Sequence, residues 1–205
     1  SKFGGWSIVT KSMMSMVSGI RESINAVRDL DAALTELRKV TDLTESQYDQ
    51  FMDRASVTAR EIGASVADTV NATADFARLG YSVEDAEQLA SAALVYKNVG
   101  DGISDISEST ESLISTMKAF DVEAENAMSI VEAFNKVGNE FAISSSGIGE
   151  ALQRSAAALA AGGNTLEESI GLVVGMNNVI QDPQKVGTTL KTVSMYLRAA
   201  KTDLE

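Results

Sequence analysis

The chain has 205 residues, a formal net charge of −12, and neither cysteine nor histidine. These counts exclude disulfides and zinc–thiolate sites, and they remove the commonest general base and the commonest transition-metal ligand. The acidic balance also disfavours binding of nucleic acid, which depends on lysine and arginine side chains at the phosphates. We therefore predict no catalytic, cofactor-binding or metal-binding residues in this segment.

The composition favours an all-α fold. Apolar residues make up 44% of the chain but aromatic residues only 5%, so we expect a core of Ala, Leu, Ile, Val and Met side chains. Pro183 is the only proline, and most glycines separate periodic segments, where helix ends use them. No apolar run approaches the roughly 20 residues of a membrane-spanning helix. Because the chain begins at Ser1 and its pattern continues to Glu205, we interpret it as a piece of a longer protein.

Residues 1–43 are predicted to form one long amphipathic helix that resembles a coiled-coil strand. Apolar residues recur at three- and four-residue steps with a mean spacing near 3.5, which places them on a single stripe. This stripe could pack within its own domain or against further copies of the same helix. The candidate residues for self-association are Ile20, Ile24, Val27, Leu30, Leu34 and Leu37. Met13, Met14 and Met16 could form an adaptable contact surface or fill a core.

Residues 44–205 are predicted to form a core region of stacked antiparallel helical hairpins. Thr44 and Gln47 have capping-box spacing at the start of a helix over 45–62, and Ser65 with Asp68 starts another. The predicted hairpins pair residues 66–79 with 83–99, 106–119 with 122–137, and 148–161 with 166–180. A final helix follows Asp182 and runs to residue 198. Each hairpin needs its neighbours to bury its apolar face, which favours compact packing.

Three similar phrases mark the predicted hairpin turns, at residues 80–84, 120–123 and 163–167. Each combines a turn or capping residue with acidic residues that open the next helix, where the helix dipole favours negative charge. The predicted cap and turn residues are Gly80, Ser82, Asp121, Gly163, Thr165, Asp182 and Pro183. Residues 141–146 interrupt the helical pattern, either as a loop with a capping serine or as a short extended contact segment.

Six longer phrases occur in a fixed order along the chain. They are residues 30–43 (LDAALTELRKVTDL), 76–82 (FARLGYS), 134–144 (FNKVGNEFAIS), 147–159 (GIGEALQRSAAAL), 162–168 (GGNTLEE) and 182–190 (DPQKVGTTL). This series, over about residues 29–198, resembles the core region of tail tape-measure proteins from long-tailed bacteriophages and prophages. The resemblance leads us to expect a basic residue at position 196, where this chain has Tyr196.

The resemblance implies a non-enzymatic structural protein of the virion, placed in the lumen of the phage tail and assembled in the cytoplasm of the bacterial host. Its implied functions are tail length determination, tail assembly and genome ejection. The implied partners are further copies of itself and the tail tube, tail-tip and assembly-chaperone proteins. We expect no direct nucleic-acid binding by this segment, and membrane contact only through regions outside it.

Without the resemblance, the residues indicate only an acidic, all-helical interaction module with an N-terminal helix that could self-associate. A non-enzymatic helical scaffold or adaptor module of a cellular protein therefore stays open at this point. A third hypothesis is an enzyme such as a cell-wall hydrolase module.

Overall fold

The protein is all-α, as the composition predicts. A computed structural model describes the backbone of residues 4–103 and 105–202 and the side chains of residues 22–103 and 105–200. Within these residues the chain forms helices and no strand. They are α1 (Gly4–Val40), α2 (Glu45–Ile62), α3 (Val66–Arg78), α4 (Val83–Val99), α5 (Ile106–Phe120), the short 3₁₀ helix η1 (Ala124–Asn126), α6 (Ala127–Glu140), α7 (Ser145–Ala161), α8 (Leu166–Ile180) and α9 (Pro183–Thr202).

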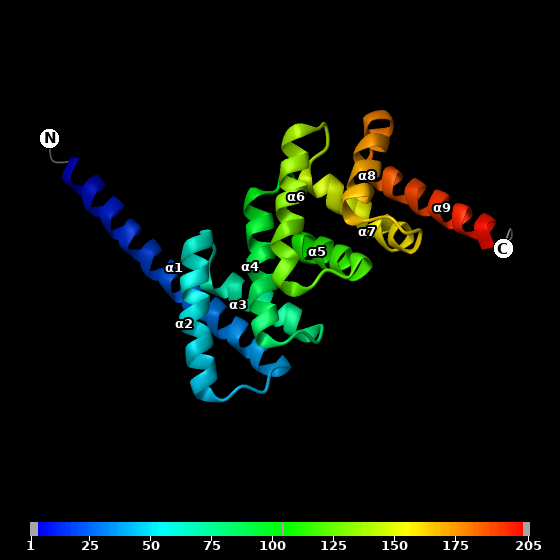
Figure 1. Cartoon of the computed structure of the whole chain (residues 1–205). Coiled ribbons are helices and arrows are strands. Elements are labelled where there is room, and N and C mark those ends of the chain that lie inside the picture. Colours follow the sequence, from blue (N-terminus) through cyan, green and yellow to red (C-terminus); the bar gives the residue numbers. More distant parts are fainter. Residues whose placement is uncertain (1–3, 104, 203–205) are drawn as a thin grey trace.

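The molecule is elongated, and a long helix extends from each end of a central bundle (Figure 1). The N-terminal part of α1 projects on one side, next to α2. The C-terminal part of α9 projects on the opposite side, beyond α7 and α8. None of the helices in the described residues is both long and apolar enough to cross a bilayer.

A small core joins the end of α1 to α2 and α3. Leu37 and Phe51 are fully buried in it. The Thr41 and Tyr48 hydroxyls, 2.8 Å apart, link the end of α1 to α2. The α2 helix begins with a capping box, in which Thr44 accepts a hydrogen bond from the Gln47 amide and the Gln47 side chain accepts one from the Thr44 amide. The docked part of α1 therefore shares a core with the helices that follow it.

A larger core extends from α3 to α9, and consecutive helices are not always the main partners in it. The α3 and α4 helices pack along each other, as predicted, but α5 packs mainly against α7 rather than α6, and α7 packs mainly against α9. Glycines at the two α7 crossings explain this arrangement. A Cβ atom on Gly187 would lie 2.5 Å from the Ala151 carbonyl oxygen, and one on Gly149 would overlap the Ser112 hydroxyl. Bare backbone at these positions lets α7 approach both α5 and α9 closely.

The expectation of a core made only from aliphatic side chains and methionine is wrong. Four aromatic rings are among the largest fully buried side chains: Phe51, Phe76, Tyr96 and Phe134. The rings of Tyr96 and Phe134 meet edge to face with centroids 5.8 Å apart, a favoured geometry for aromatic pairs. Composition gives the number of rings but not their position, and here a few rings occupy central sites among many alanines.

Side chains and glycines form most of the predicted turns. The Ser82 hydroxyl accepts a hydrogen bond from the Asp85 amide at 3.1 Å, and the Thr165 hydroxyl accepts one from the Glu168 amide at 3.2 Å. Gly80 and Gly163 have φ values of 93° and 91°, the left-handed conformation that glycine adopts without strain. At the next helix start, Asp182 accepts a hydrogen bond from the Lys185 amide at 3.1 Å, and Pro183 is the first residue of α9.

The middle turn differs from the other two. Asp121 has a φ of 55° and ends α5, so it does not act as the N-cap of the following helix. That position belongs to Glu123, which makes no side-chain capping bond, and the chain passes through η1 before α6 begins. The loop interpretation, with its capping serine, is confirmed for residues 141–144, because α6 ends at Glu140 and the Ser144 hydroxyl caps α7. Ser145 and Ser146 instead belong to the first turn of α7.

Candidate interaction surfaces

The apolar stripe of α1 divides into a docked part and an exposed part. Of the predicted self-association residues, Leu37 is fully buried and Leu30 and Leu34 are partly buried against the small core. Ile24 and Val27 are 54% and 68% exposed. The side chains of Ile20 and of Met13, Met14 and Met16 lie outside the described residues. Ile24 and Val27 are thus the described members of the stripe that another chain could contact.

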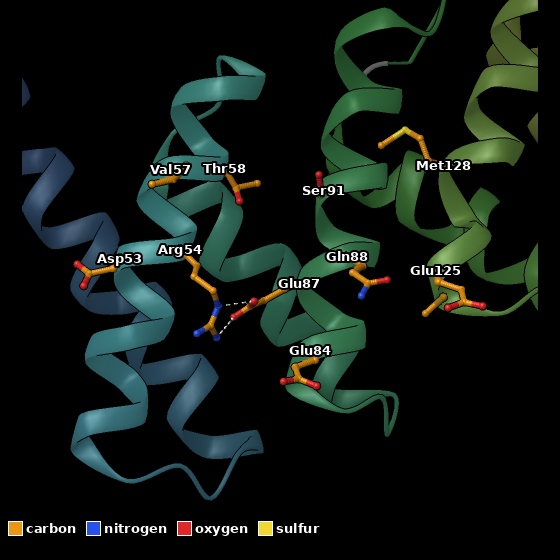
Figure 2. Close-up of a pocket in the computed structure, with 11 residues that line it drawn as sticks. Asp53, Arg54, Val57, Thr58, Glu84, Glu87, Gln88, Ser91, Glu125 and Met128 are labelled. Carbon is orange, nitrogen blue, oxygen red and sulfur yellow. Dashed lines mark hydrogen bonds and ion pairs between the residues drawn. The ribbon is translucent and has the colours of Figure 1, made fainter.

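A groove of about 860 Å³ runs along the outer face of α4, between α2 and the start of α6 (Figure 2). We call it the acidic groove. Its lining residues recur at three- and four-residue steps on α2 and α4, because each of these helices presents one face to it. The groove is lined by Asp53, Arg54, Val57, Thr58, Glu84, Glu87, Gln88, Ser91, Ala124, Glu125 and Met128.

One ion pair joins two sides of the acidic groove. The Arg54 guanidinium donates two hydrogen bonds to the Glu87 carboxylate, at 2.6 and 2.9 Å, and so links α2 to α4 (Figure 2). The hydrogen bond and charge of Glu87 raise the pKa of Arg54 above its usual range. The lining contains four carboxylates and this one guanidinium, a net charge of −3. Val57, Ala124 and Met128 add apolar surface to the walls.

The second exposed apolar face lies on α9. Val186 and Leu190 are buried in the large core, and the same stripe continues at steps of three and four residues to Val193 and Leu197. These last two are 45% and 68% exposed. Tyr196, which stands where the family resemblance leads us to expect a basic residue, is also exposed.

A smaller polar cleft of about 380 Å³ lies between α5 and α7. Its acidic side chains are Asp105, Glu108, Glu111 and Glu150. Tyr96 lies at its buried side and donates a hydrogen bond to the Ser145 carbonyl at 2.7 Å. Burial raises the pKa of Tyr96 far above its usual range, so this hydroxyl stays neutral and acts as a structural donor.

Carboxylates are the main charged groups in both described hollows. The acidic groove contains carboxylates, an amide and hydroxyls with a single paired guanidinium, and the α5–α7 cleft contains carboxylates, an amide and hydroxyls with no basic side chain in its described lining. Among the described residues, no cluster of three or more acidic side chains has a geometry that could hold a metal ion. The acidic pairs that open α4 and α8 lie in the first turns of those helices, at positions that the helix dipole favours.

The sequence analysis did not predict the acidic groove or the exposed face of α9, for different reasons. The groove is lined by residues between 53 and 128, on helices that are far from one another in the sequence, so no local sequence pattern predicts it. The α9 surface could have been predicted from the sequence, because residues 183–202 contain four basic residues, no acidic residue and a regular apolar stripe.

Comparison with known proteins gives one family. Residues 55–205 match the sequence model of the family described as phage-related minor tail protein. The match covers α3 to α9 and residues 55–62 of α2, and so includes the acidic groove apart from its residues Asp53 and Arg54. No solved structure matches the chain.

Proposed function

Because the chain belongs to the family of phage-related minor tail proteins and so has a structural role in a phage tail, we propose that it is the core region of a tail tape-measure protein. Family membership shows that the chain is a phage tail protein. The proposal that it is a tape-measure protein is supported by the six ordered sequence segments over about residues 29–198. In this role the chain lies in the tail lumen, sets tail length during assembly and takes part in genome ejection. Its partners there are the tail tube, tail-tip and assembly-chaperone proteins.

The proposed role includes self-association through α1. Ile24 and Val27 continue the stripe that Leu34 and Leu37 use inside the chain, and they are exposed. Exposed apolar residues in this pattern are suited to pairing with an identical helix. Copies of the chain would then lie side by side along α1 while their helical bundles remain separate.

The acidic surface suits a segment in a tube that DNA must traverse. With 29 acidic and 17 basic residues, the chain carries a net charge of −12 and offers few cations to phosphates. We therefore propose that this segment does not bind the passing genome. Contacts with a membrane, if the whole protein makes them, belong to other regions.

An in-frame deletion in the parent phage gene tests the measuring role. Removal of residues 16–29 takes out 14 residues of α1 and keeps Leu30, Leu34 and Leu37 in their docked positions. If this helix is part of an extended ruler, the deletion shortens tails by about 21 Å, at ~1.5 Å per residue. Tail length is measured by electron microscopy of purified particles.

A control of unchanged length separates measuring from self-association. The double variant Ile24→Asp, Val27→Asp disrupts the exposed stripe but removes no residue, so tails that do form should have wild-type length. Full-length tails after the 14-residue deletion would contradict a measuring role for α1. Wild-type tails from a phage that lacks the whole segment would contradict the tape-measure proposal itself.

A further inference from the structure

The cleft between α5 and α7 contains a buried oxygen that receives no hydrogen bond. Ser112 lines this cleft from α5 but is only 2% exposed, so its hydroxyl lies at the bottom of the cleft. No described group is within hydrogen-bonding geometry of the Ser112 Oγ atom. The Tyr96 hydroxyl lies nearby, but it donates its single proton to the Ser145 carbonyl at 2.7 Å. The Ser112 oxygen therefore lacks a donor, and a buried polar atom in this state indicates a missing partner.

Carboxylates line the cleft around this oxygen from both helices. Glu111 precedes Ser112 on α5, and Glu150 lies on α7, the main packing partner of α5. Asp105 and Glu108 add two further carboxylates on the α5 side. The described lining contains no basic side chain to balance these four acidic residues. Because a cleft lined by charge of one sign concentrates the opposite charge, this cleft should attract cations.

The arrangement of the carboxylates favours an organic cation over a metal ion. Among the described residues, no three acidic side chains are placed so that they could hold one metal ion. The acidic side chains are instead distributed around a hollow of about 380 Å³. A primary ammonium group has three N–H donors, so it can donate one hydrogen bond to a hydroxyl oxygen and the others to carboxylates. Carboxylates at separate positions suit a ligand that carries a second ammonium group at some distance from the first.

We propose that the α5–α7 cleft binds an aliphatic polyamine. One ammonium group donates a hydrogen bond to the Ser112 oxygen, and Glu111 and Glu150 balance its charge. The methylene chain packs against Ile103, and a second ammonium group pairs with the carboxylate of Asp105. The site depends neither on the tape-measure role nor on self-association through α1.

Isothermal titration calorimetry on the whole 205-residue chain at low salt tests the site with two simple amines. Putrescine is a four-carbon diamine, and butylamine is a monoamine of the same chain length. We expect putrescine to bind at one site per chain. It should bind at least about tenfold more tightly than butylamine, because its second ammonium group forms an additional charge-assisted contact.

The variant Ser112→Ala tests the contact at the bottom of the cleft. It should weaken putrescine binding by about tenfold, because it removes a hydrogen bond to a charged group. The free protein should unfold at the same or a higher urea concentration than the wild type, because the variant no longer buries a hydroxyl without a donor. Weaker binding by a protein of undiminished stability cannot be attributed to misfolding.

A pair of matched variants tests the carboxylates. Glu111→Gln with Glu150→Gln should weaken putrescine binding at least about tenfold, because neutral amides replace both carboxylates beside the bound ammonium group. The control, Glu132→Gln with Glu140→Gln, makes the same change in net charge at two exposed positions of α6. The control should bind putrescine like the wild type.

Four results would overturn the proposal. The first is no binding of putrescine up to a concentration on the order of 1 mM. The second is an equal loss of affinity in the α6 control and in the cleft variant, which would indicate general attraction to an acidic surface. The third is unchanged affinity of Ser112→Ala. The fourth is binding of a lysine-containing peptide, but not of putrescine, with the same dependence on the cleft residues, which would assign the cleft to a side chain of a partner protein.

Discussion

Gly149 illustrates how a single missing side chain determines the packing of the larger core. A Cβ atom at this position would overlap the Ser112 hydroxyl and lie 2.8 Å from the Tyr96 hydroxyl. We expect Gly149→Ala to lower the free energy of unfolding by about 1–3 kcal/mol, because a close-packed core has no room for the added methyl group. Thermal or urea unfolding followed by circular dichroism measures the change.

The matched control is Gly171→Ala on α8, where nothing lies within 4 Å of the added Cβ. Here the better helix propensity of alanine should raise stability by about 0.5–1 kcal/mol. Equal effects of the two substitutions would mean that helix propensity, and not the close approach of α5 and α7, decides the result at Gly149.

A second prediction at the residue scale concerns the pH dependence of the α9 cap. Hydrogen bonds from the side chain and amide of Lys185 lower the pKa of Asp182 below its usual range. A lowered pKa in the folded state adds stability above the usual carboxyl pKa of about 3.9, and this stability disappears as the pH falls through the lowered value. Asp182→Asn keeps a good N-cap but loses the charge. The wild type should therefore be more stable than the variant at pH 6, and the difference in urea midpoint should shrink below about pH 4. A difference independent of pH would contradict this account.

At the scale of elements, the two parts of α1 should differ sharply in their effect on stability. Leu37→Ala removes a fully buried side chain and should cost about 2–5 kcal/mol. Val27→Ala, at a 68% exposed position of the same stripe, should change the stability of the monomer by no more than about 0.5 kcal/mol. Unfolding at low protein concentration measures both. A large effect of Val27→Ala at high concentration alone would indicate self-association through α1.

Helix boundaries were the most predictable feature of the fold, because local side chains set them. The capping boxes at Thr44 and Thr165 and the Asp182–Pro183 pair mark the starts of α2, α8 and α9. The main partner of each helix was less predictable. The turn signals favour pairing of α5 with α6, but the partner of α5 depends on the distant Gly149, where α7 crosses it.

At the scale of the whole molecule, the same limit applies to the candidate site. The stripe at Ile24 and Val27 could be read from the sequence because it lies on one helix. The acidic groove could not, because α2, α4 and α6 contribute to it from residues 53–128. Local periodicity identifies a face of a helix, whereas a groove also requires knowledge of which helices pack side by side.

The two projecting ends should be the least protected parts of the isolated molecule. Residues 22–29 of α1 and 195–200 of α9 are exposed on all sides, and a helical segment of this length is marginal in water without tertiary contacts. In dilute solution we expect fast amide hydrogen exchange at both ends and slow exchange in α4 and α7, which supply much of the large core. Protection of the α9 end equal to that of α7 would mean that this helix is stabilised within its own chain.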